Sequence, residues 1–138
     1  MKRILVGACA MAVTACAAPG SAGAPDASLG GTRWVGVVDS SVAKEATPWI
    51  EFLREGRLTG YSGCNMLSGG WSGEGASARL SGLVATKRYC LGAAGDLEKR
   101  VLAAMTAESR ITREGERLVV TSPGGARFEF VKMVSGSK

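Results

Sequence analysis

The chain has 138 residues, a length that predicts one domain, and its composition of 46 % hydrophobic and 21 % charged residues excludes wholesale disorder. Lysine and arginine (17) outnumber aspartate and glutamate (12), but basic and acidic residues are interspersed, which argues against nucleic-acid binding. Histidine is absent, which excludes Ser-His-Asp and Cys-His catalysis and HExxH metal sites. The 20 glycines, about twice the usual share, indicate many tight turns and a β-rich fold.

The first residues have the layout of a secretory signal peptide. Lys2 and Arg3 precede an apolar stretch at 4–13, which is shorter than the ~20 residues of a membrane-spanning helix. Residues 13–16, VTAC, then resemble the bacterial lipobox. That resemblance implies cleavage before Cys16, attachment of diacylglycerol to its sulfur and acylation of the new amino terminus, which together make a stable anchor. The alternative is a plain signal peptide cut near Ala18.

The residues after the cysteine predict a destination and a tether. In lipoproteins an aspartate directly after the cysteine usually marks retention at the inner membrane, so Ala17 implies the outer membrane, facing the periplasm. The following stretch is almost entirely alanine, glycine, serine and proline, which predicts a flexible linker. The expected organisation is a lipoprotein signal peptide at 1–15, a tether at 16–31, one domain at 32–134 and a polar tail at 135–138.

Within the domain, short β-branched or alternating segments separated by glycine-containing turns predict strands. Glu55-Gly56 has the form of a two-residue hairpin turn, because glycine readily adopts a positive φ. A second glycine-containing turn at 73–75 joins the next two strands. In chain order, the expected strands are 32–39, 49–54, 57–61, 66–72, 78–84, 109–113, 117–122 and 126–133.

The exception is the stretch 93–107, which predicts an amphipathic helix. Leu97 and Val101 recur at helical spacing, and charged residues at 98–100 lie opposite them. Asp96 is expected near its start, as a cap or an acidic residue of the first turn. The predicted fold class is therefore mainly β (β-rich α+β): a curved antiparallel sheet or small barrel with one amphipathic helix packed on it.

Several stretches together resemble the META domain, or HslJ-like, family. The most specific is GRLTGYSGCNMLSG at 56–69; a second is LVATKRYC at 83–90, in which Arg88 stands where methionine is usual, and a third is the acidic, leucine-containing helix at 96–105. The resemblance implies a compact, mostly β fold with a single helix in bacterial envelope proteins, a link to stress tolerance and envelope integrity, and no catalytic mechanism. The signature residues, to which we assign structural roles, are Gly60, Gly63, Cys64, Asn65, Ser68, Gly69, Thr86 and Cys90.

Once Cys16 is lipidated, Cys64 and Cys90 are the remaining thiols of the mature chain. An even pair in an oxidising compartment is expected to form a disulfide. Two free buried thiols are the main alternative. Redox or metal chemistry is disfavoured, because no histidine can serve as a base or a ligand. We expect no metal and no cofactor.

Two polar or aromatic features could be functional or structural. Asn65 could belong to a polar recognition site, but an asparagine amide can equally bond backbone groups around a turn, and we favour that structural role. Packing is the default role for Trp71 in a strand-like segment, but glycines and serine flank it, so the alternative is an exposed side chain that forms an interaction surface.

The function expected from these features is that of a non-enzymatic, outer-membrane-anchored envelope lipoprotein that acts through protein interactions in envelope integrity or stress tolerance. Its expected partners are the membrane, through Cys16, and an envelope protein. The alternative is a barrel that carries a small apolar ligand in its interior. A packing of Trp49, Phe52, Leu97 and Phe130 that fills that interior would count against a carrier.

Overall fold

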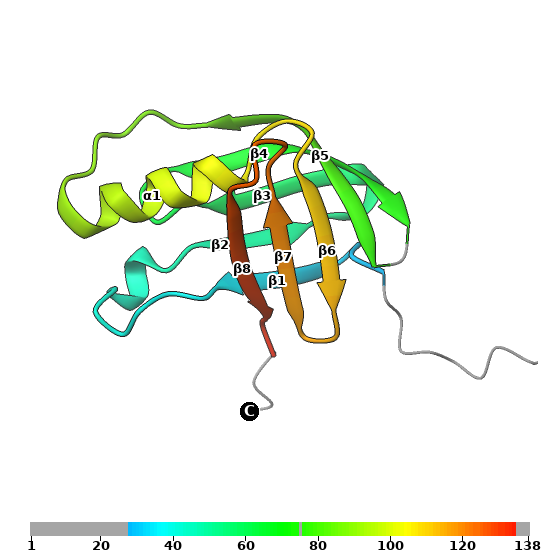
Figure 1. The fold of residues 1–138 in the computed structure, drawn as a ribbon, viewed down its shortest axis with the longest axis horizontal. Coiled ribbons are helices and arrows are strands. Elements are labelled where there is room, and N and C mark those ends of the chain that lie inside the picture. Colours follow the sequence, from blue (N-terminus) through cyan, green and yellow to red (C-terminus); the bar gives the residue numbers. More distant parts are fainter. Residues whose placement is uncertain (1–27, 75, 135–138) are drawn as a thin grey trace, which may run out of the picture.

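The computed structural model describes residues 28–74 and 76–134 and shows a closed antiparallel barrel with one helix (Figure 1). Each of the eight strands pairs with the next, and the last closes on the first. The predicted fold class is confirmed, and the barrel rather than the open sheet is the form that occurs. The elements are β1 (Thr32–Gly36), β2 (Trp49–Phe52), β3 (Arg57–Tyr61), β4 (Met66–Glu74), β5 (Ser77–Ala85), α1 (Gly92–Ala104), β6 (Arg110–Glu114), β7 (Arg117–Thr121) and β8 (Arg127–Lys132).

Alternation along the strands divides the barrel into an apolar interior and a polar exterior. In β8, for example, Phe128 and Phe130 are buried inside while Arg127 and Val131 are exposed. Closure is achieved by pairing of β1 with β8, in which Val35 lies opposite Val131. The largest interior side chains, all essentially inaccessible to solvent, are Trp34, Ile50, Phe52, Leu67, Leu80, Ile111, Leu118, Val120 and Phe130.

The predicted hairpin turn joins β2 to β3. Glu55 and Gly56 both have positive φ, at 70° and 74°, so the turn lies where the sequence places it. It is not the two-residue turn that was predicted: Phe52 lies opposite Leu58 and the Leu53 N–H donates to the Arg57 carbonyl, which leaves residues 54–56 in the loop. Local sequence therefore predicts the position of this turn but not its length.

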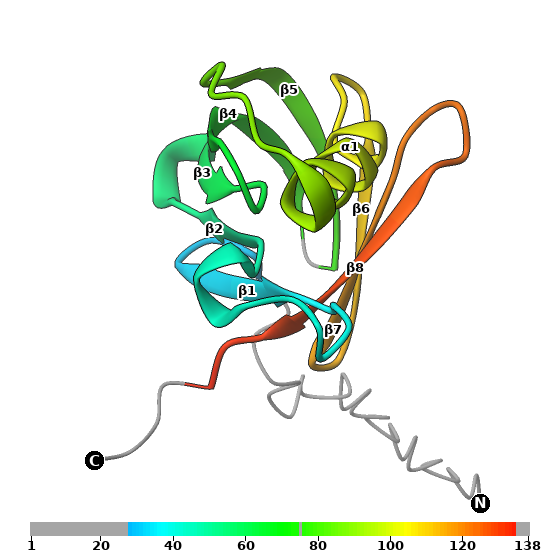
Figure 2. The same cartoon turned by 90° about the vertical axis from the view of Figure 1, so that its left-hand side faces the viewer.

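Helix α1 lies across one end of the barrel, as Figure 2 shows. It buries Leu97, Val101 and Ala104 in the common core, which confirms the predicted apolar face. The expected role of Asp96 is wrong: the helix begins earlier, at Gly92, after a Leu91 that makes no side-chain cap. Asp96 is instead exposed one turn inside the helix, where its carboxylate lies 3.4 Å from the Lys99 ammonium.

The packed domain begins before the predicted boundary at Thr32. Leu29 is only 1 % exposed and belongs to the core, and Arg113 donates a hydrogen bond of 3.0 Å to the Ser28 carbonyl. The expected tether at 16–31 is therefore too long at its carboxyl end. Although small residues surround Leu29 in the sequence, burial of its apolar side chain in the core is favourable. The predicted signal peptide at 1–15, Cys16, the tether up to 27 and the tail at 135–138 lie outside the described residues.

None of the helices in the described part of the chain combines the length and the apolar character needed to cross a membrane.

Candidate functional site

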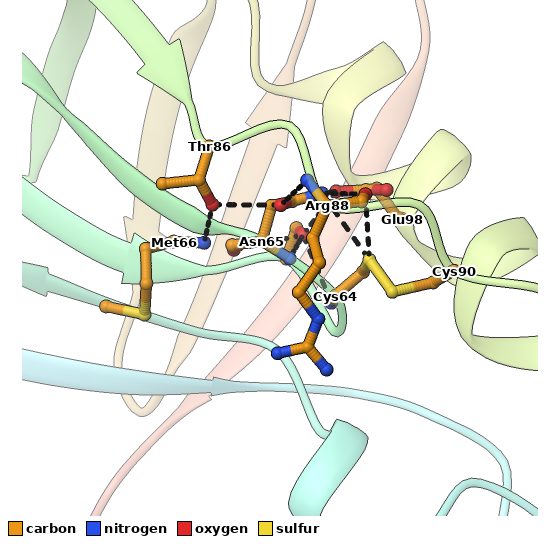
Figure 3. Close-up of a disulfide and its surroundings, with 8 residues drawn as sticks. Cys64, Asn65, Met66, Thr86, Arg88, Cys90 and Glu98 are labelled. Carbon is orange, nitrogen blue, oxygen red and sulfur yellow. Dashed lines mark hydrogen bonds between the residues drawn. A yellow bond between two sulfur atoms is a disulfide. The ribbon is translucent and has the colours of Figure 1, made fainter.

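Four of the signature residues, Cys64, Asn65, Thr86 and Cys90, meet at the end of the barrel where α1 packs. A disulfide joins Cys64, in the turn between β3 and β4, to Cys90, in the segment that leads into α1, with their Cα atoms 6.1 Å apart (Figure 3). This is the pairing expected from the sequence. The bond closes a separation of 26 residues, and in the chain-entropy model a loop of that length stabilises the fold by about 3–4 kcal/mol.

Asn65 is the centre of a hydrogen-bond network beside the disulfide (Figure 3). Its amide nitrogen donates to the Arg88 carbonyl at 2.9 Å and to the Glu98 carboxylate at 2.7 Å. Its amide oxygen accepts from the Arg88 N–H at 2.6 Å and from the Thr86 hydroxyl at 2.8 Å. Both amide hydrogens and both oxygen lone pairs are thereby used, so the favoured structural role for Asn65 agrees with its surroundings.

Ser62 extends this network under the turn. Its buried hydroxyl accepts from the Asn65 N–H at 2.8 Å and lies 2.8 Å from the carboxylate of Glu98, to which it donates. Glu98 thus ties α1 to the turn before β4. From the sequence, Glu98 is predicted only to lie on the charged side of the helix. Its position directly after the buried Leu97 is the one signal that its side chain could turn inward.

Two signature glycines are required by close backbone approaches. Gly63 has φ of 100°, and a Cβ there would lie 2.9 Å from the Ala46 carbonyl oxygen. A Cβ on Gly60 would lie 2.7 Å from the carbonyl oxygen of Trp49 on the paired strand. Real Cβ atoms do not come this close to backbone oxygen, so larger residues would displace the turn or strand β2.

The other signature residues separate into different roles. Thr86 belongs to the network, because its hydroxyl also accepts from the Met66 N–H at 3.0 Å. Gly69 lies at the irregularity in the pairing of β4 with β5, between Ser68 and Gly70. Ser68 itself is exposed on the outside of β4. We define the clamp as Ser62, Gly63, Cys64, Asn65, Thr86, Cys90 and Glu98, together with the backbone of Arg88.

Trp71 packs at the edge of the core. It is half-buried, its ring meets Phe52 edge-on at 5.5 Å between centroids, and its indole N–H donates to the Leu53 carbonyl at 3.1 Å. Packing was the role expected for it by default, and a surface contact through the exposed part of the ring stays a prediction.

The buried polar groups of the clamp are bonded to one another. Among the described residues, every buried side-chain nitrogen or oxygen has a hydrogen-bond partner. Likewise, over 28–74 and 76–134 no three histidine, cysteine or acidic side chains are grouped so that they could hold a metal ion. A fully bonded polar network of this kind rigidifies the backbone that it contacts.

What the clamp fixes is the segment 86–91, here called the clamped loop. The loop is held by the Thr86 hydroxyl, the Arg88 backbone and the Cys90 sulfur, whereas Tyr89 and Leu91 are 86 % and 76 % exposed. Lys87 and Arg88 are exposed beside them. Two clefts of about 260 and 510 Å³ flank the loop, and both are lined by Arg88, Tyr89 and Glu98.

The barrel interior counts against an apolar-ligand carrier. Three of the four side chains whose packing was expected to count against a carrier, Phe52, Leu97 and Phe130, are buried in it. Trp49 does not take part: it lies on the outside of β2, where the guanidinium of Arg33 stacks 3.8 Å from its ring centroid.

The fold and the signature together define the class of protein. Residues 27–135 match the family model of the META domain, and this chain belongs to that family. A comparison with curated protein sequences finds no match. Among solved structures, an NMR structure of a protein from Burkholderia xenovorans is similar with a TM-score of 0.57 and 18 % identity over 77 % of this chain and 84 % of that one. A second NMR structure matches with the same TM-score and identity over 75 % of this chain and 90 % of its own.

Proposed function

We propose that this META-domain protein is a non-enzymatic envelope lipoprotein that binds a partner protein through the clamped loop. In this proposal, lipid on Cys16 holds the chain at the outer membrane, facing the periplasm, and the interaction serves envelope integrity or stress tolerance. The family membership, the lipobox-like VTAC at 13–16 and the absence of histidine support these parts of the proposal. Membrane attachment would also raise the local concentration of the domain near envelope partners.

The observation that carries the interaction is the contrast between the backbone and the side chains of the clamped loop. A disulfide and three hydrogen bonds of the Asn65 side-chain amide are used to fix a segment whose own tyrosine and leucine are left in solvent. For folding alone, a loop of small polar residues would serve equally well. A rigid loop loses little conformational entropy on binding, and tyrosine is among the residues that dominate protein interfaces.

The charges around the loop indicate the chemistry of the partner surface. Lys87 and Arg88 are exposed next to Tyr89. The planar guanidinium of Arg88 can form a bidentate pair with a carboxylate, with one N–H donating to each oxygen. The partner is therefore expected to present an apolar depression for Tyr89 and Leu91 with acidic residues at its rim.

Site-specific photo-crosslinking in the native host tests the interaction. A photoreactive aromatic residue at position 89 should give a discrete adduct, because Tyr89 is 86 % exposed and carries the proposed contact. The same residue at Glu116, an exposed turn position, serves as control and should not give it. Replacing both Cys64 and Cys90 by alanine should weaken the adduct at position 89. Equal adducts at positions 89 and 116, or none at 89, would contradict the proposal.

The lipid anchor is tested separately by Cys16→Ser. The variant should lose incorporation of labelled fatty acid and leave the membrane fraction, whereas Cys9→Ser, within the predicted signal peptide, should keep both properties. If Cys16→Ser stays in the membrane fraction without labelled lipid, another attachment holds the protein there and the anchor assignment is wrong.

A further inference from the structure

Two arginines lie side by side on the outside of the barrel, away from the clamped loop. Arg79 of β5 is directly opposite Arg110 of β6, two strands that are neighbours in Figure 1. The Leu80 N–H donates to the Ser109 carbonyl and the Arg113 N–H donates to the Ala76 carbonyl. Hydrogen-bonded and non-hydrogen-bonded pairs alternate along an antiparallel ladder, so the pair of Arg79 with Arg110, next to Leu80 and Ser109, is a non-hydrogen-bonded pair. At such positions of an antiparallel ladder the Cα atoms are only about 4.5 Å apart and the side chains approach most closely.

This pairing is unfavourable for an isolated barrel. Like charges directly opposite each other destabilise an antiparallel pair. Glu108 compensates in part, because its carboxylate lies 3.7 Å from the guanidinium of Arg79. Within 28–74 and 76–134, no carboxylate lies within 4.0 Å of the Arg110 guanidinium, so one positive charge of the pair has no protein counterpart.

The same two arginines line a cleft of about 560 Å³. Thr112 and Thr121 also line it and bring hydroxyl groups, and Glu108 is the one acidic residue of the lining. Arg127 adds further positive charge at its edge, because it is exposed on β8 directly opposite Thr121. The cleft thus combines an excess of guanidinium groups with neutral hydrogen-bond donors.

We propose that this cleft binds a phosphate group. A guanidinium presents N–H donors in a planar fork that matches the oxygens of phosphate or carboxylate. Two such forks and two hydroxyls supply more donors than the two oxygens of one carboxylate can accept, whereas a phosphate monoester offers three terminal oxygens. The bound dianion would also neutralise the cross-strand pair, which gives a physical reason for keeping two arginines in register. This site is independent of the clamped loop and of its proposed partner.

Titration of the full-length protein with inorganic phosphate at constant ionic strength, followed by NMR, tests the site. We expect saturable shifts of amides on β5, β6 and β7 near Arg79, Arg110 and Thr121. Arg110→Gln should weaken binding by about tenfold or more, because a charge-assisted hydrogen-bonding group is lost. Arg57→Gln removes an exposed arginine of β3 that does not line the cleft, and should bind as the parent does. No shifts beyond those in chloride, or equal losses in both variants, would overturn the proposal.

A second readout separates binding from folding. In low-salt chloride buffer, Arg110→Gln should raise the melting temperature by about 1–4 °C, because cross-strand repulsion is relieved. Added phosphate should raise the melting temperature of the parent protein and of Arg57→Gln but not that of Arg110→Gln. A phosphate effect of equal size in all three proteins would show general salt stabilisation and would also refute the site.

Vesicles distinguish the source of the phosphate. Sedimentation with vesicles containing phosphatidic acid, which has a phosphomonoester headgroup, is compared with sedimentation with phosphatidylcholine alone. Binding to the former that is lost in Arg110→Gln supports the site and identifies a lipid headgroup. Saturable binding of inorganic phosphate without vesicle binding supports the site and identifies a soluble phosphorylated ligand. Failure of both phosphate arms overturns it.

Discussion

The clamp and the barrel interior stabilise the same domain by different physical means. The interior is a set of apolar side chains, among them Trp34, Phe52 and Phe130, whose contribution depends on the area removed from water and on close packing. The clamp consists of a disulfide and directional hydrogen bonds around Asn65. The interior should therefore tolerate exchange of one apolar side chain for another of similar volume. The clamp should be destabilised by a substitution that preserves the volume but removes a hydrogen-bond donor or acceptor.

The largest effect is expected in the interior. Phe130→Ala should lower the free energy of unfolding by about 3–5 kcal/mol, because it removes a fully buried aromatic ring and leaves a cavity. Urea unfolding followed by tryptophan fluorescence measures the change. Leu118→Met, also at a fully buried position, should cost less than about 1.5 kcal/mol because the volume is kept. Similar costs for the two variants would show that the interior is not governed by packing.

Removal of the disulfide should have the next largest effect. Replacing Cys64 and Cys90 together by alanine should cost about 3–4 kcal/mol, because the unfolded chain regains the entropy of an open loop. The intact mass of the parent protein under non-reducing conditions should be lower by two hydrogen atoms than after reduction. A mass that reduction does not change would mean that the two thiols are free, and the clamp would then rest on hydrogen bonds alone.

An isosteric change should damage the clamp where it would be mild in the interior. Asn65→Asp should cost about 2–4 kcal/mol, because a carboxylate cannot donate to the Arg88 carbonyl and would face the Glu98 carboxylate. The double variant Asn65→Asp with Glu98→Gln should recover part of the loss, since the glutamine amide can donate to the new aspartate. Additive losses in this double-mutant cycle would argue against direct coupling of the two side chains.

The smallest effect is expected at Arg88, where the clamp uses only the backbone. Arg88→Met should change the stability by no more than about 0.5 kcal/mol, because the exposed side chain contributes nothing to the network. Arg88→Pro, in contrast, removes the N–H that donates to Asn65 and should cost about 1–3 kcal/mol. A large loss in the methionine variant would show that the guanidinium itself supports the loop. This use of the backbone explains how arginine can stand where the family usually has methionine.

Local sequence was sufficient for most of the fold. Apolar alternation predicted the strands, and Glu55-Gly56 predicted a turn whose positive φ values are now observed. The apolar spacing of Leu97 and Val101 predicted the buried face of α1. These features depend on backbone preference and on side-chain periodicity, which neighbouring residues determine.

Other features depended on what the closed barrel brings together. Leu29 follows a stretch of small residues, and its burial depends on the core cluster of the barrel, which it joins. The residues beside Trp71 left packing and exposure both open, and its packing depends on Phe52 and the Leu53 carbonyl, which reach it from another hairpin. Asp96 was expected near a helix start, whose position was set by the disulfide-bonded segment before it.

The sequence by itself determined a β-rich chain with one amphipathic helix, a hairpin turn and a cysteine pair, because each of these is encoded over a few residues or by composition. Only the tertiary structure decided that the sheet closes between β1 and β8, that the Glu98 side chain turns inward to Asn65, and that Arg79 lies opposite Arg110 on neighbouring strands beside a cleft. The physical reason is register: which side chains face each other across strands depends on the pairing of the whole barrel, and no single segment contains that information.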